Sequence, residues 1–116
     1  MYREFLTPDD EDVYEAIGEW PDSDESGARI LTLQDNSGQS ITFSYDALAR
    51  SVRIHWVNDQ GVEMLDFFRE SATRLSFTSG KSAKHISVDF HMGECAGTTE
   101  IQLSPRLSVR DRLLFQ

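Results

Sequence analysis

A strict alternation of apolar and polar residues is the feature that most restricts the fold of this chain. It is clearest in residues 84–92 (KHISVDFHM). Four apolar side chains share one face of this segment, namely Ile86, Val88, Phe90 and Met92. A period of two residues is typical of a β-strand that buries one face. The segment is therefore predicted to be a strand with one wet and one buried face.

Six further segments are predicted to be strands, and turn sequences separate them: residues 28–34, 39–45, 51–58, 62–69, 73–78 and 98–104. Residues 62–69 have a less regular period, but the hairpin-like turn at 58–61 favours a strand. Residues 106–115 fit either a closing strand or a short amphipathic helix. Consecutive hairpins of this kind predict an antiparallel meander of six to eight short strands.

One helix is predicted before the strands. Thr7 is a suitable N-cap, and Pro8 is well tolerated at the first helical position. Gly18 and Pro21 indicate that the helix stops between them. An apolar stripe follows one side at spacings of three and four: Val13, Ala16, Ile17 and Trp20. We therefore expect an α+β fold in one domain, residues 1–116, with the helix covering one face of the sheet.

The net negative charge of the chain comes entirely from its first quarter. Residues 1–27 hold ten acids and one base, whereas residues 28–116 hold ten of each, so the net charge of −9 belongs to the first segment. The acids of this segment that follow residue 8 are Asp9, Asp10, Glu11, Asp12, Glu15, Glu19, Asp22, Asp24 and Glu25. Such an acidic chain is not expected to bind nucleic acid or an anionic membrane.

Four of these acids lie on the helix side opposite the apolar stripe: Glu11, Asp12, Glu15 and Glu19. Like charges four residues apart destabilise an isolated helix by about 0.2–0.5 kcal/mol per pair, so helix stability does not explain them. The face is either ordinary solvated surface or a docking surface for a basic partner. Trp20 is interpreted either as a core anchor or as an exposed aromatic contact beside the acids. The docking hypothesis takes the nine acids above together with Trp20 as the partner-binding residues.

Catalytic and metal-binding signatures are weak. His85, Asp89 and His91 share one strand face, and Cys95 follows His91 by four residues, but no recognised ligand or nucleophile spacing surrounds them. No cofactor and no metal are therefore expected, and the chain is not predicted to be an enzyme. The single cysteine fits a reducing compartment, and neither a signal peptide nor a membrane span is recognised, so a cytoplasmic location is expected.

In its size, its acidity and the segregated run of Asp9, Asp10, Glu11 and Asp12 with Glu15 and Glu19, the chain resembles small immunity proteins of bacterial toxin systems. Those of contact-dependent growth inhibition are included. The resemblance implies a non-enzymatic cytoplasmic protein that binds a toxin domain, often a basic nuclease, and blocks its active site. The alternative is an acidic secretion-type chaperone or adaptor, a homodimer that binds an extended segment along a sheet edge.

Overall fold

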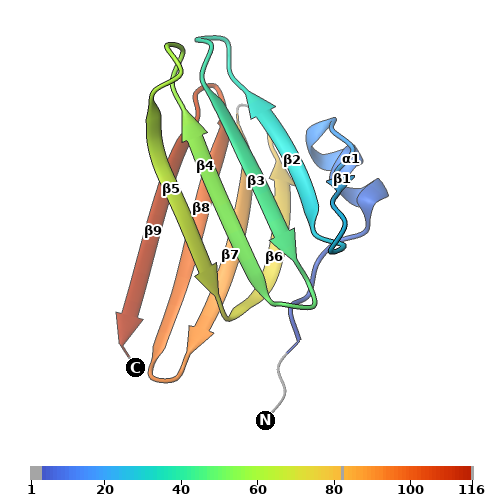
Figure 1. Cartoon of the computed structure of the whole chain (residues 1–116), viewed down its shortest axis with the longest axis vertical. Helices are drawn as coiled ribbons and strands as arrows, with labels where there is room; N and C mark the ends of the chain where they lie inside the picture. The colour runs from blue at the N-terminus through green and yellow to red at the C-terminus, as the bar shows by residue number, and fades with distance from the viewer. Residues whose placement is uncertain (1–3, 82, 116) are drawn as a thin grey trace.

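A computed structural model describes residues 4–81 and 83–115, and within them lie one helix and nine strands (Figure 1). The elements are α1 (Asp10–Ile17), β1 (Asp22–Ser23), β2 (Arg29–Gln34), β3 (Ser40–Asp46), β4 (Ser51–Val57), β5 (Glu63–Glu70), β6 (Ala72–Ser79), β7 (Lys84–Met92), β8 (Cys95–Ser104) and β9 (Ser108–Phe115). The predicted α+β class is confirmed. The segment at 106–115, which the sequence left open, contains a strand.

The antiparallel meander is confirmed, and it is folded over into two sheets. Strands β1 to β5 form the first sheet and β6 to β9 the second, each strand pairing with the next in the chain. The fold-over is at Ser71, a non-glycine residue with φ 70°. Its neighbour Ala72 donates its N–H to the carbonyl of Arg50 (3.0 Å), and Ser71 accepts from the N–H of His91 (3.1 Å). These bonds tie the corner to both sheets.

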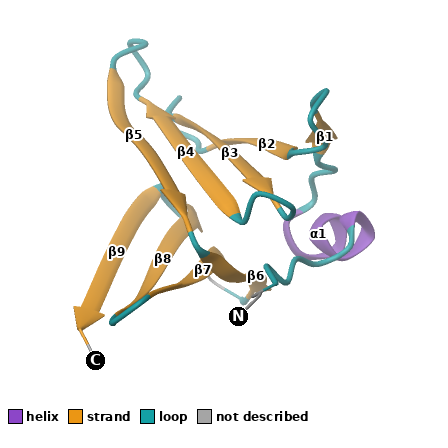
Figure 2. Ribbon diagram, turned by 60° about the horizontal axis from the view of Figure 1, so that its bottom comes forward, coloured by secondary structure: helices purple, strands orange, loops and turns teal. Residues whose placement is uncertain are grey.

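The core lies between the two sheets, because the apolar faces of their strands point toward one another. Phe43 and Ile54 come from the first sheet, Ile86 and Ile101 from the second, and all are almost completely buried. We expected the helix to cover a sheet face. Instead each sheet covers the other, and α1 lies at one side of the pair, near β1, β2 and β6 (Figure 2).

The segment before α1 fixes that side of the molecule. Leu6 forms a parallel bridge with Arg74 of β6, donating to Thr73 O and accepting from Leu75 N, both at 2.9 Å. Phe5 is buried beside this bridge, and Val13 and Ile17 of α1 extend the same core. The outer edge of β6 is therefore paired at residues 73–75.

The segment 62–69 is a strand, as predicted, and its register separates the two adjacent phenylalanines. Phe67 packs against the core, whereas Phe68 on the opposite face has 64% of its surface exposed. Met64 shares the outer face of β5 with Phe68 and is 53% exposed. Adjacent residues of a strand point to opposite faces, so only one of the two phenylalanines can join the core, and Phe68 is the exposed one.

A close approach between β8 and β9 yields a prediction about stability. Gly97 lies opposite Leu113, and a Cβ on it would meet Leu113 Cδ2 at 2.5 Å and the Arg112 carbonyl oxygen at 2.7 Å. The leucine can turn away, but the backbone oxygen moves only if β9 moves. We expect Gly97→Ala to lower the free energy of unfolding by about 1–3 kcal/mol, measured by urea denaturation.

Gly80→Ala is the matched control for this change. A Cβ at Gly80 would make only an ordinary contact, 3.5 Å from Ala83 O. Equal urea midpoints for the two variants would show that β9 can move away from a Cβ at position 97 without loss of stability.

Candidate partner-binding surface

The helix that carries most of the acids begins two residues later than predicted. Asp9, with φ −65° and ψ 155°, is the N-cap, and its carbonyl accepts the first helical bond from Val13 N (3.1 Å). Thr7 and Pro8 lie outside the helix, because pairing of Leu6 with β6 holds the preceding chain extended. Asp10, Glu11 and Asp12 form the first turn, where the helix dipole favours negative charge.

The acids predicted to bind a partner lie on one side of the molecule. Helix α1 and the β1 segment are neighbours on the same side in both views (Figures 1 and 2). Eight of the nine predicted acids have exposed side chains, namely Asp9, Glu11, Asp12, Glu15, Glu19, Asp22, Asp24 and Glu25. We refer to these eight residues as the acidic surface.

Asp10 differs from the other predicted acids because Arg29 of β2 pairs with it. The Arg29 Nε donates to Asp10 Oδ1 at 3.1 Å, and each side chain is 39% exposed. A partly exposed pair with one contact contributes little to stability. Arg29 therefore neutralises one carboxylate and leaves the acidic surface intact.

Asp24 has a structural role within the acidic surface. Its Oδ1 accepts from Ser26 Oγ (2.6 Å), Ser26 N (2.9 Å) and Ala28 N (3.1 Å), which closes the loop after β1. The hydrogen bond from the Ser26 hydroxyl, together with these backbone donors, lowers the pKa of Asp24. This carboxylate is thus both charged and fixed in place.

Trp20 is exposed, so the core-anchor interpretation is wrong. It retains 56% exposure and stacks on Tyr14, with ring centroids 4.9 Å apart and an interplanar angle of 16°. The reason is Gly18, the C-cap, whose φ of 80° turns the chain out of the helix after Ile17. Trp20 therefore leaves the apolar stripe and folds back on α1.

Sequence reasoning missed Tyr14 as part of this surface. Tyr14 is 45% exposed, and its carbonyl accepts from Gly18 N at 2.8 Å in the C-cap. Gly18 is a typical helix C-cap residue. Ending the predicted helix at Gly18 would have excluded Trp20 from the buried apolar stripe. An exposed aromatic pair, Tyr14 and Trp20, therefore lies on the same segment of the chain as the acidic surface.

The weak catalytic and metal-binding candidates, His91 with Cys95 and the His85–Asp89–His91 face, do not form a site. Cys95 pairs with Met92 across the β7–β8 hairpin, so it shares a sheet face with Met92, whereas His91 projects from the opposite face. Asp89 accepts a hydrogen bond from Thr98 Oγ1 at 3.0 Å. Within residues 4–81 and 83–115, no three His, Cys, Asp or Glu side chains are grouped as a metal site.

The helix of the described segments is too short and polar to cross a membrane. Its eight residues are Asp10–Ile17.

The fold defines a class of two-sheet α+β proteins in which one helix closes the side of a folded meander. No family model and no curated protein sequence matches the chain. Among solved structures it is similar to a chain of the contact-dependent growth inhibition toxin–immunity protein complex from Klebsiella pneumoniae 342. The TM-score is 0.80 at 14% identity, over 93% of this chain and 96% of that one. The resemblance inferred from the sequence is therefore confirmed at the level of the fold.

Proposed function

We propose that this chain is an immunity-type inhibitor that binds a toxin domain and performs no catalysis of its own. The observation that carries the proposal is the shared fold, which extends over 93% of this chain and 96% of a chain from a toxin–immunity complex. That complex contains a toxin and an immunity protein. The immunity role, which is that of the inhibitor, suits a chain whose net charge of −9 is concentrated on one side.

The partner in this proposal is a basic toxin domain, most simply a nuclease in the cytoplasm, whose active site the inhibitor occludes. Nucleases carry positive surface because their substrate is a polyanion. The acidic surface would speed encounter with such a partner and disfavour partners that are themselves acidic. The exposed Tyr14–Trp20 pair would supply desolvated apolar contact at its centre.

The decisive experiment pairs this chain with the toxin domain encoded beside its own gene. We expect tight one-to-one binding by titration calorimetry, and loss of toxin activity as the inhibitor reaches equimolar amounts. Affinity capture from the native lysate at low and high salt identifies the partner if the neighbouring gene is not a toxin. A neighbouring toxin that remains fully active with excess inhibitor would contradict the proposal.

Removing the exposed tryptophan tests the aromatic contact. We expect Trp20→Ala to raise the Kd for the toxin by more than tenfold, mainly through faster dissociation, because a central aromatic contact is lost. Val62→Ala is the matched control, since Val62 is 53% exposed and lies in the turn between β4 and β5. The two rates are compared by surface plasmon resonance. Equal small effects of both changes would place Trp20 outside the interface.

A second candidate, the acidic chaperone or adaptor, is favoured by the outer face of β5. Phe68 and Met64 are exposed there by 64% and 53%, which suits a homodimer interface. Sizing chromatography with light scattering separates the candidates. A stable dimer that Phe68→Ser converts to a monomer would support the adaptor, and a monomer would exclude this dimer.

A further inference from the structure

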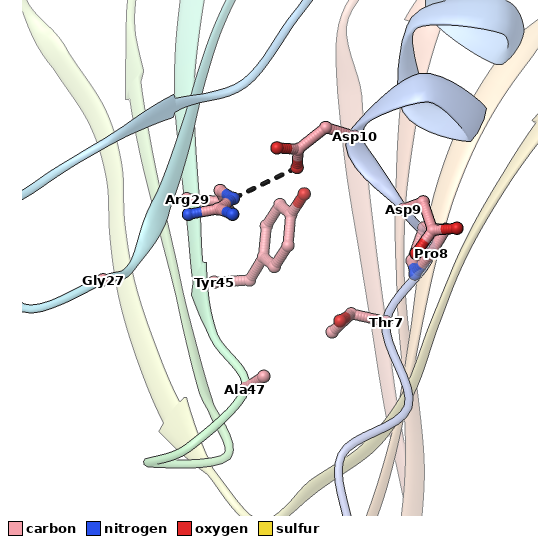
Figure 3. A pocket seen from close by; sticks show the side chains of 8 residues that line it. All are labelled: Thr7, Pro8, Asp9, Asp10, Gly27, Arg29, Tyr45 and Ala47. Atoms are coloured by element: carbon pink, nitrogen blue, oxygen red, sulfur yellow. Dashed lines mark hydrogen bonds and ion pairs between the residues drawn. The ribbon is translucent and has the colours of Figure 1, made fainter.

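A cavity of about 350 Å³ opens beside the start of α1 and contains a polar group that the acidic surface does not explain (Figure 3). Thr7, Asp9 and Asp10 line one wall, from the segment that enters the helix. Arg29 of β2 and Tyr45 of β3 line the other. The cavity therefore lies where the N-terminal segment meets the first sheet.

The hydroxyl of Tyr45 is buried and unpaired. Only 3% of the residue is exposed, and no described residue hydrogen-bonds its oxygen. In Figure 3 this oxygen points toward the pair formed by Asp10 and Arg29. Buried hydroxyls nearly always have a hydrogen-bond partner, so this one, on a residue that lines the cavity, is free to bond a group that enters there.

The charges around the hydroxyl select a cation. Burial, and then the negative charge of Asp10, raise the pKa of Tyr45 to about 12, while Arg29 acts in the opposite direction with a smaller effect. The hydroxyl is therefore neutral at physiological pH and able both to donate and to accept a hydrogen bond. Asp9 also lines the cavity, and Glu11 and Asp12 follow Asp10 in the first turn of α1, so the charge at this place is predominantly negative.

Arg29 shows how a guanidinium fits at this place. It reaches Asp10 through Nε alone, at 3.1 Å, and Oδ2 of Asp10 accepts no hydrogen bond from any described residue. Since both side chains are 39% exposed, the pair exchanges readily with another cation. Arg29 can therefore move aside without breaking a buried ion pair.

We propose that this cavity receives one arginine side chain of the partner, which takes the place of Arg29 at Asp10 and hydrogen-bonds to the Tyr45 hydroxyl. The proposal rests on the proposed function for the source of that arginine. It adds a specific contact to a surface that otherwise acts through its overall charge. A guanidinium has five N–H donors in a plane, enough to reach the carboxylate and the hydroxyl together.

The test uses a defined probe and needs no toxin. N-acetyl-arginine amide is titrated into the isotope-labelled protein, and backbone amide shifts are followed by NMR. We expect saturable shifts at Thr7, Asp9, Asp10, Arg29 and Tyr45. N-acetyl-citrulline amide, which has the same shape without the charge, is expected to cause none of comparable size.

Four variants separate the contributions to this binding. Asp10→Asn and Tyr45→Phe are each expected to weaken binding of arginine amide at least fivefold. Arg29→Gln is expected to leave it unchanged or strengthen it, because a competing cation is removed. Glu94→Gln, in the β7–β8 turn, is the control and is expected to have no effect. Thermal melts of each variant confirm that it folds.

Three results would overturn the inference: equal binding of citrulline amide, shifts that spread over all the acids, or weaker binding of arginine amide after Arg29→Gln, which would show that Arg29 does not compete with the probe for Asp10. A chain that binds arginine amide here but inhibits no toxin would overturn the proposed function alone. A chain that inhibits its toxin yet gives no local shifts with arginine amide would overturn the cavity alone.

Discussion

Simultaneous replacement of Glu11, Asp12, Glu15 and Glu19 by lysine is expected to slow association with the toxin by about 10- to 1000-fold at low salt. All four side chains are exposed, and no ion pair involving them occurs among the described residues. Their reversal changes the net charge from −9 to −1 and makes the outer face of α1 positive, together with position 19, which lies just beyond the helix end at Ile17. A face that attracted a basic partner would then repel it.

The fold is expected to survive this change. Val13 and Ile17, which anchor α1 in the core, are untouched. Lysines four residues apart repel each other about as much as the carboxylates they replace. Two lysines in the first turn oppose the helix dipole, a cost of about 0.3–1 kcal/mol each. Circular dichroism and a thermal melt check that the variant folds before its kinetics are compared.

The measurement is the association rate constant by stopped flow at several salt concentrations. Attraction between exposed charges is screened over about 8 Å at physiological ionic strength. The association rate constants of the wild type and the four-lysine variant should therefore converge as salt rises. The control reverses Asp59, Glu63, Glu70 and Glu94, which lie on other parts of the surface and bring the net charge to the same −1. Equal losses in both variants would show that net charge alone matters and that α1 is not the docking face.

The arrangement of this face could be predicted because it depends on local rules. Residues three and four apart share a helix face, so Val13 and Ile17 inward imply Glu11 and Glu15 outward. Strand periods similarly predicted which side chains are buried, as at Ile86 and Val88. These inferences need no knowledge of which elements meet in space.

What the sequence did not predict depends on contacts between distant segments. The chain folds over at Ser71 with a positive φ, and no glycine at this position indicates such a turn in the sequence. A single sheet was therefore expected where the structure has two. Asp10 pairs with Arg29, which is 19 residues away in the chain. That the Tyr45 hydroxyl is buried without a partner could be known only from the folded structure. Alternation marks Tyr45 as buried but says nothing about partners for its oxygen.

Loss of the Asp111 carboxylate is expected to have the largest effect of any single charged side chain on stability. Asp111 of β9 accepts two bonds from Arg69 of β5, at 2.8 and 2.7 Å, and one from the Thr99 hydroxyl at 2.7 Å. The Arg69 guanidinium also lies 4.6 and 5.0 Å from the ring centroids of Phe67 and Phe90. This cluster joins the last strands of the two sheets, on the side away from α1 (Figure 2).

Asp111→Ala is expected to lower the free energy of unfolding by about 2–4 kcal/mol at pH 7, measured by urea denaturation. The Arg69 side chain, only 16% exposed, would keep its charge without its partner, and the almost fully buried Thr99 would lose its acceptor. Asp66→Ala is the matched control. It breaks an Arg53 pair of similar geometry, 3.1 and 3.0 Å, whose side chains are 54% and 41% exposed, and is expected to lower stability far less than Asp111→Ala.

The effect of Asp111 also depends on pH in a direction that follows from its pKa. Hydrogen bonds from Arg69, and then from Thr99, hold the pKa of Asp111 below the ordinary value of 3.8 despite partial burial. A carboxyl with a lowered folded-state pKa stabilises the protein above its unfolded-state pKa, and this contribution disappears as the pH falls through the folded-state value. The stability gap between wild type and Asp111→Ala should therefore be full at pH 7 and shrink below about pH 4. A gap that stays constant down to pH 2, or one no larger than that of Asp66→Ala, would mean that the packing between the sheets holds this side together without the ion pair.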